Sequence, residues 1–182
     1  MARLPTVSRD RLNPEDQGYF DEIAESRGSV RGPYGVLLHN PKLAARIAAT
    51  GAYVRFEFDL SEALKEVVIL ATAREIKSQY EFSAHARLAR NAGVSEDTIR
   101  SIAQGTAPQG LSEDEGLLVR YAHELLRDHK ITDATFNAVH ARLGDQGTIG
   151  LTGLIGHYLL VGQFLTAFDV ELGAGMTPEL PL

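Results

Sequence analysis

The chain has 182 residues, 44% of them hydrophobic and 23% charged, which argues against a disordered chain or a membrane protein and favours a single domain over residues 1–182. Its formal net charge of −6 argues against nucleic-acid partners, because phosphate binding needs clustered lysine and arginine. The chain has no cysteine, so disulfides, thiolate metal sites and cysteine nucleophiles are all excluded.

The first predicted helix covers residues 13–27, where an asparagine N-cap is followed by proline at the first helical position. The residues before this helix have no apolar run between their charges, so we expect no secretory signal and a cytoplasmic location. After it, residues 28–35 include three glycines and a proline, a composition that predicts a loop. This loop carries Tyr34.

A second asparagine–proline pair predicts a helix over residues 40–56. Asp59 stands three residues before Glu62, which is the spacing of a capping box, and the pair predicts the start of a long helix. This helix contains the apolar run of residues 67–71, and Glu66 comes directly before that run. A carboxylate at this position needs a buried partner or lies at the edge of the helix.

The densest group of proton-transferring side chains follows that long helix. Ser78 precedes Glu81 by three residues and predicts the capped start of a helix over residues 79–91. Glu81 and His85 are four residues apart, so they lie one turn from each other, in reach of a shared substrate or water molecule. An ordinary contact on a solvated helix face would also explain the pair. The apolar residues around it favour a packed helix, and there such a pair lines a pocket.

The rest of the chain predicts helices only. Capping residues precede, and glycines often follow, four apolar-periodic segments: residues 98–104, 112–126, 132–143 and 146–168. His123 and His129 fall off the apolar stripe of the second of these segments, so we expect them at the surface. No segment alternates like a strand between hairpin turns, and we therefore predict an all-α fold.

The last predicted helix has two features that bear on function. Its apolar run, residues 151–168, is interrupted by glycine, histidine and glutamine, which favours a buried helix and no membrane span. Small residues from Gly147 to Gly156 allow another helix to approach closely and suit an oligomer interface. His157 lies among apolar neighbours, so it is either a core histidine bonded to a carbonyl or a group that lines a pocket.

The motif formed by Glu66, Ser78, Glu81 and His85 resembles the carboxymuconolactone decarboxylase and alkylhydroperoxidase D superfamily. In the peroxidase branch of that superfamily a Cys-x-x-Cys pair is redox active, and a glutamate and a histidine relay protons. Ser78 and Glu81 occupy the two cysteine positions here, so thiol chemistry is excluded. The sequence Tyr-Glu-Phe around Glu81, followed by His85, is instead similar to the decarboxylase branch, which has Tyr-Glu-Trp and then histidine.

This resemblance implies a compact helical bundle that assembles into a trimer or hexamer. It also implies a lyase or isomerase that acts on a small organic acid or lactone in aromatic compound catabolism, by proton transfer and without a cofactor. Glu81 and His85 would form the catalytic pair, with either one as the acid, and Glu66 would orient His85 or its water molecule. Decarboxylation needs a donor for the developing enolate, and a protonated histidine is the obvious donor in the motif.

The expected substrate-binding residues are Ser78, Arg74, Tyr34 and His157. Arg74 is a candidate clamp for a substrate carboxylate, although it could equally pair with a neighbouring glutamate.

Two alternatives remain open at this point. The protein could be a non-catalytic member of the superfamily that binds a ligand or serves in assembly. A metal site made by His85, Glu66 and His157 would need contacts between helices that a sequence does not reveal, and we expect none.

Overall fold

The computed structural model describes residues 2–181, and within this range the fold is all-α, as predicted. Two π-helical turns, η2 (Tyr53–Glu57) and η3 (Glu124–Asp128), continue the third and seventh helices, and a short 3₁₀ turn, η1 (Arg9–Arg11), precedes the first. The helices are α1 (Pro14–Arg27), α2 (Pro33–Leu37), α3 (Pro41–Ala52), α4 (Glu62–Glu75), α5 (Gln79–Asn91), α6 (Glu96–Gln104), α7 (Glu113–His123) and α8 (Asp133–Ala167).

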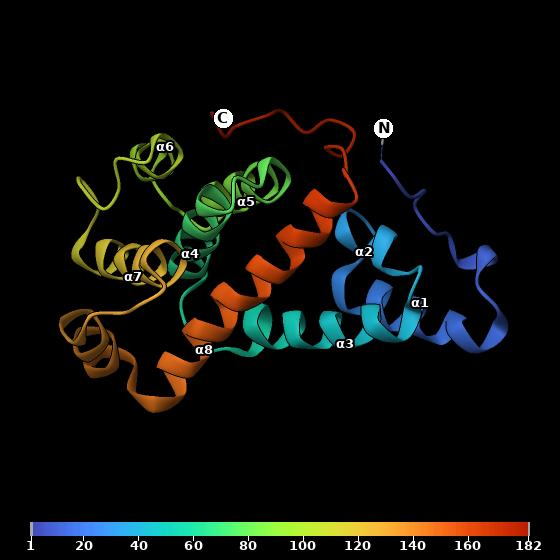
Figure 1. The fold of residues 1–182 in the computed structure, drawn as a ribbon, viewed down its shortest axis with the longest axis horizontal. Helices are drawn as coiled ribbons and strands as arrows, with labels where there is room; N and C mark the ends of the chain where they lie inside the picture. Colours follow the sequence, from blue (N-terminus) through green and yellow to red (C-terminus); the bar gives the residue numbers. More distant parts are fainter. Residues whose placement is uncertain (1, 182) are drawn as a thin grey trace.

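Helix α8 crosses the molecule between two groups of helices, α1–α3 on one side and α4–α7 on the other (Figure 1). It contributes Leu151, Leu154 and Ile155 to a hydrophobic cluster shared with α4–α7. About two to three turns later, Val161 and Leu165 belong to a second cluster, shared with α1–α3. The part of α8 between these two sets therefore lies where the two cores meet.

Helix α4 is the most buried element of the larger core. Every residue from Lys65 to Ala73 is buried, because α5, α6, α7 and α8 all pack against this helix. Its start differs from the prediction: Ser61, not Asp59, is the N-cap, and its hydroxyl accepts a hydrogen bond from the Leu64 amide at 3.3 Å. Glu62 could not complete a capping box with Asp59, because its carboxylate binds Lys65 at 2.8 Å.

The loop predicted over residues 28–35 is shorter than expected, because α2 begins at Pro33. Proline suits the first position of a helix, and Gly32 before it adopts φ +56°, a left-handed value that glycine tolerates. All five residues of α2 are buried. Tyr34 is therefore held by a packed helix.

The separate helices predicted before and after Gly144 are present, and they meet at a kink within α8. Gly144 has φ +66° and ψ −171°, values that no α-helix contains.

By length and composition alone α8 could cross a membrane, but 56% of its most apolar window is buried inside the fold. Burial of this extent also characterises the core helix of a water-soluble protein, as the glycine-interrupted sequence predicted.

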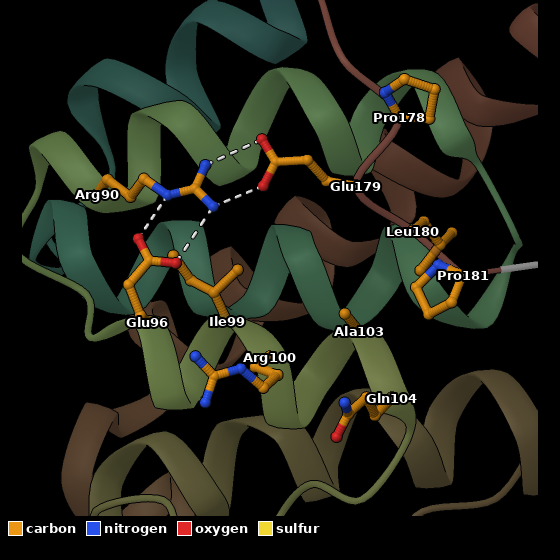
Figure 2. Close-up of a pocket in the computed structure, with 10 residues that line it drawn as sticks. All are labelled: Arg90, Glu96, Ile99, Arg100, Ala103, Gln104, Pro178, Glu179, Leu180 and Pro181. Atoms are coloured by element: carbon orange, nitrogen blue, oxygen red, sulfur yellow. Dashed lines mark hydrogen bonds and ion pairs between the residues drawn. The ribbon is translucent and has the colours of Figure 1, made fainter.

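The chain after α8 returns over α5 as an extended tail (Figure 1). Arg90 on α5 holds the tail, since its guanidinium binds the Glu179 carboxylate at 2.6 Å and the Glu96 carboxylate at 2.6 Å (Figure 2). The Glu179 amide donates a hydrogen bond to the Ser83 hydroxyl at 3.1 Å, and Leu180 is buried in the larger core. The tail is thus packed on the body of the protein.

Candidate active site

Glu66 and His85 form the innermost pair of the site. They come together because α4 and α5 pack closely, and His85 Nδ1 lies 2.6 Å from Glu66 Oε2. Both side chains are almost fully buried. A hydrogen bond this short between an imidazole and a carboxylate places the hydrogen on Nδ1 and fixes the orientation of the ring. Glu66 thus has the buried partner that its position in α4 requires.

Arg55 contacts the centre of the site but was not predicted from the sequence, and the same is true of Arg27 and Tyr158, which also line the pocket described below. Arg55 lies in η2 and donates hydrogen bonds to Glu66 Oε1 and to the Tyr158 hydroxyl, each at 3.1 Å. Its Nη1 atom also lies 3.4 Å from His85 Nε2. Arg55 therefore pairs with the Glu66 carboxylate and places an N–H group next to the outer nitrogen of His85.

Glu81 lies on the other side of His85, with Oε2 3.4 Å from Nε2. Only 4% of this residue is exposed, and burial raises the pKa of its carboxyl group, although His85 and Arg55 oppose that rise. The Glu81 carboxyl group therefore keeps its proton to a higher pH than an exposed glutamate does. The site thus contains two carboxyl groups in different surroundings: Glu66 lies within hydrogen-bond distance of Arg55 and His85, whereas burial favours the acid form of Glu81.

Ser78 positions Glu81 through the backbone. Its hydroxyl accepts a hydrogen bond from the Glu81 amide at 3.4 Å, which is half of the expected capping box. The other half is not formed, because the Glu81 side chain faces His85 instead of the Ser78 amide. Ser78 is outside the lining of the pocket described next, so its place in the structure does not support the expected contact with substrate.

A pocket of about 180 Å³ opens onto Glu81 and His85. Its other walls come from α2 and from the middle of α8, and they include Tyr34, His157 and Tyr158. Two of the four expected substrate-binding residues, Tyr34 and His157, therefore line the same pocket as Glu81 and His85.

Three buried polar atoms of this pocket have no hydrogen-bond partner in the described part of the chain: Arg27 Nε, Tyr34 Oη and His157 Nδ1. An unsatisfied buried polar group typically costs about 1–3 kcal/mol, so such groups gather where a ligand supplies the partner. Burial raises the pKa of Tyr34 to about 12 and lowers the pKa of His157 to about 4. Both side chains are therefore neutral at pH 7, and the tyrosine is a hydrogen-bond donor.

His157 is held in place by packing on the backbone of α3. Its ring and the Arg27 guanidinium both lie against Gly51, where an added side chain would overlap with them. The expected bond from a core histidine to a carbonyl is not formed, since Nδ1 has no partner among the described residues. The alternative expectation, a histidine that lines a pocket, describes its position.

Arg74 does not reach the pocket, and its expected role as a carboxylate clamp is not supported. It lies eight residues after Glu66 on the same helix, a rise of about 12 Å, and its guanidinium packs beside Gly105 at the end of α6. The arginines that line the pocket are Arg27, Arg31 and Arg55.

His123 is less exposed than the sequence predicted. Its side chain is 12% exposed and lies 3.4 Å from Glu75, and burial lowers its pKa. His129 is exposed, in agreement with the prediction. Within residues 2–181, no three histidine, aspartate or glutamate side chains are grouped so that they could hold a metal ion, and this includes the set of His85, Glu66 and His157.

Comparison with known proteins places these features in context. The model of the carboxymuconolactone decarboxylase family matches residues 41–124, a range that contains Glu66, Glu81 and His85. No curated protein sequence matches the chain.

Solved structures share the fold at low sequence identity. A peroxidase-related protein from Ralstonia eutropha, described as an alkylhydroperoxidase AhpD core, has a TM-score of 0.79 and 15% identity, covering 98% of each chain. A peroxidase-related protein from a Silicibacter species has a TM-score of 0.74 and 19% identity, over 95% of this chain and 92% of that one. The debrominase Bmp8 has a TM-score of 0.73 and 14% identity, over 93% and 91% of the two chains. These matches, with the family model, confirm that the chain has an AhpD-like fold and resembles the carboxymuconolactone decarboxylase family.

Proposed function

We propose that this protein is a lyase of the carboxymuconolactone decarboxylase type, which removes a carboxyl group from a small organic acid or lactone by proton transfer. The observation that carries the proposal is the pairing of a buried Glu81, whose pKa is raised by burial, with a His85 that lies 2.6 Å from Glu66. This arrangement provides an acid and a route for its reprotonation without a thiol.

The unpartnered donors of the pocket would receive the substrate. Arg27 Nε and the Tyr34 hydroxyl can both donate hydrogen bonds to a carbonyl oxygen, and both are fixed in place by packing. When the bond to the leaving carboxylate breaks, its electron pair moves to that oxygen and carbon dioxide is released. Donors held against the developing negative charge stabilise the transition state more than the substrate. In this mechanism they replace the protonated histidine that the sequence suggested.

Glu81 would then deliver its proton to the substrate carbon and become a carboxylate. His85 would return a proton to Glu81 from solvent, while Glu66 keeps the Nδ1 hydrogen in place. One proton is consumed and one carbon dioxide is released in each cycle. The protein needs no other reactant for this sequence.

A small ring is a suitable substrate for a pocket of about 180 Å³. A cysteine-to-alanine variant of the structurally similar debrominase has been crystallised with 2,3,4-tribromopyrrole, which is also a compact five-membered ring. This likeness supports a compact cyclic group at the reactive end of the substrate, and a lactone has that shape.

The proposal is tested by incubating the purified protein with carboxymuconolactone and measuring release of carbon dioxide. His85→Gln should lower kcat by about 10²–10⁴-fold. Its unfolding midpoint should fall by only a few degrees, because about 1 kcal/mol shifts a domain of this size by about 2–4 °C. His140→Gln removes a half-exposed histidine outside the pocket and should retain full activity. Binding of the lactone without any turnover would instead support the non-catalytic alternative.

A further inference from the structure

A second, larger cavity adjoins the candidate active site. It has a volume of about 1000 Å³ and shares the wall residues Arg31, Tyr80 and Ala84 with the inner pocket. Its remaining walls come from the exposed side of α5 and from the tail between Val170 and Glu179. We call this cavity the outer groove.

Tyr80 forms the partition between the inner pocket and the outer groove. It is half-buried, and its hydroxyl lies so close to Gly32 that an added side-chain carbon there would be only 2.5 Å away. On the tail, a side-chain carbon added at Gly173 would lie 3.9 Å from the same hydroxyl, which is ordinary van der Waals contact. Gly32 thus leaves room for the Tyr80 ring, and the tail lies next to it.

The sizes of the two compartments suggest that one ligand uses both. Sites for small molecules typically have volumes of about 300–1,000 Å³. The inner pocket, at about 180 Å³, holds only the reactive end of a ligand of ordinary size. The remainder of such a ligand would pass Tyr80 and lie in the outer groove.

The charges of the outer groove indicate what that remainder carries. Arg31 and Arg87 are exposed in the groove, and neither guanidinium group forms a hydrogen bond or ion pair within residues 2–181. The third arginine, Arg90, is occupied by Glu96 and Glu179 (Figure 2). Glu179 is therefore neutralised, and the second groove carboxylate, Glu171, has an interaction of its own. Two guanidinium groups are thus left to bind an anion.

We propose that the outer groove is a binding subsite for the distal carboxylate of an elongated dicarboxylic acid. The reactive end of that acid would lie in the inner pocket beside Arg27 and Tyr34, and its far carboxylate would bind Arg31 and Arg87. Guanidinium groups bind carboxylates in a two-pronged geometry, which suits this assignment. The inference rests on the proposed function, since it names the class of substrate for that same site.

The test is calorimetric titration of the full chain with linear α,ω-dicarboxylates, from succinate to dodecanedioate, and with monocarboxylates of matching length. Once a dicarboxylate is long enough to reach from the inner pocket past Tyr80 into the outer groove, it should bind about three- to tenfold more tightly than the monocarboxylate of the same length. Arg31→Gln and Arg87→Gln should each reduce this advantage by about threefold, and Arg87→Gln, whose side chain lines only the outer groove, should leave monocarboxylate binding unchanged. Arg120→Gln, which removes an exposed arginine of α7 that lines neither cavity, should preserve the advantage.

Two results would overturn the subsite. One is equal binding of dicarboxylates and monocarboxylates at every length, including no binding of either. The other is a loss of advantage in Arg31→Gln and Arg87→Gln that is no greater than in Arg120→Gln. These titrations do not depend on turnover. A dicarboxylate advantage in a protein that releases no carbon dioxide would contradict the decarboxylase proposal alone, and decarboxylation without the advantage would contradict the subsite alone.

Discussion

The guanidinium carbon of Arg27 lies 4.2 Å from the centre of the Tyr34 ring, and each of these stacked side chains keeps a buried polar atom without a partner. Stacking fixes the direction of both groups without using their hydrogen-bonding capacity. Arg27 is held further by a hydrogen bond to the Ala48 carbonyl at 3.3 Å. The pair thus forms a rigid set of donors at the pocket.

Tyr34→Phe should separate binding from stability. The variant removes a buried hydroxyl that has no partner, so its free energy of unfolding should be unchanged or about 1 kcal/mol higher. Its kcat should fall by about 10²–10³-fold if the hydroxyl stabilises an oxyanion. The matched control is Tyr121→Phe, because the Tyr121 hydroxyl is bonded to Thr152 at 2.7 Å. This control should lose about 1 kcal/mol of stability and keep its activity. Equal destabilisation of the two variants would contradict the prediction.

Glu81 should make the protein less stable as the pH rises. Its folded pKa is raised above the ordinary value of 4.5, so below pH 4.5 the carboxyl group is protonated in both states and has no effect. Above pH 4.5 the unfolded chain loses this proton first, and stability falls until the pH passes the folded pKa. The fall is at most about 1.4 kcal/mol per pH unit.

Glu81→Gln should remove that fall, and chemical unfolding between pH 4 and pH 9 would measure it. The helix cap is preserved in this variant, because Ser78 binds the Glu81 amide and not its side chain. Parallel stability curves for the variant and the native protein would show that the carboxyl group ionises normally in the fold.

His157 should have the opposite effect in acid. Its folded pKa of about 4 is below the ordinary 6.5, so its contribution to stability is complete above pH 6.5 and is lost as the pH falls through 4. Between pH 7 and pH 4 the native protein should lose about 3 kcal/mol more than His157→Gln does. Glu81 and His157 change the stability of the protein in opposite directions as the pH changes. The two single variants are therefore compared with the native protein separately. An equal loss of stability in the native protein and in His157→Gln would mean that the folded protein protonates His157 as readily as the unfolded chain does.

The exposed face shared by α3 and α8 is the surface on which we expect homo-oligomers to form. Ile149 is 73% exposed and Leu160 is 43% exposed, and between them Gly153 and Gly156 line a shallow apolar groove. Light scattering should give a mass that is a multiple of 19.8 kDa, with a trimer or hexamer as the expected assembly. Ile149→Glu should lower the measured mass toward that of the monomer. Phe136→Glu, which changes another exposed apolar side chain, should leave the mass unchanged. A native monomer at micromolar concentration would contradict this prediction.

Local sequence signals predicted most of the fold and the central pair of the site. Capping residues located the starts of most helices, because an N-cap hydrogen bond is a local interaction that its own residues specify. The spacing of Glu81 and His85 was sufficient to place them together, since the geometry of one helical turn determines their separation.

Groups that reach the site through tertiary packing could not be predicted in this way. Arg55 precedes His85 by 30 residues and Tyr158 by 103, and no periodic pattern links these positions. Arg74 was a plausible clamp because it is near the motif in sequence, but two turns of helix separate it from Glu66. The short helix α2 was missed because its proline and glycines indicate a turn, whereas burial against α3 and α8 stabilises it.

Gly162 lies one turn after Tyr158 on α8, and a side chain there would collide with Ile76 at the end of α4. The missing side chain lets α8 settle against the corner between α4 and α5, close to Ser78. The contact between α8 and this corner therefore depends on a position next to Val161, which lines the pocket. The atom that an added carbon would meet first is the tip of the flexible Ile76 side chain, so alanine at this position needs only a shift of Ile76. A longer side chain would have to displace Ile76 further, and the pocket wall beside Val161 would then move with α8.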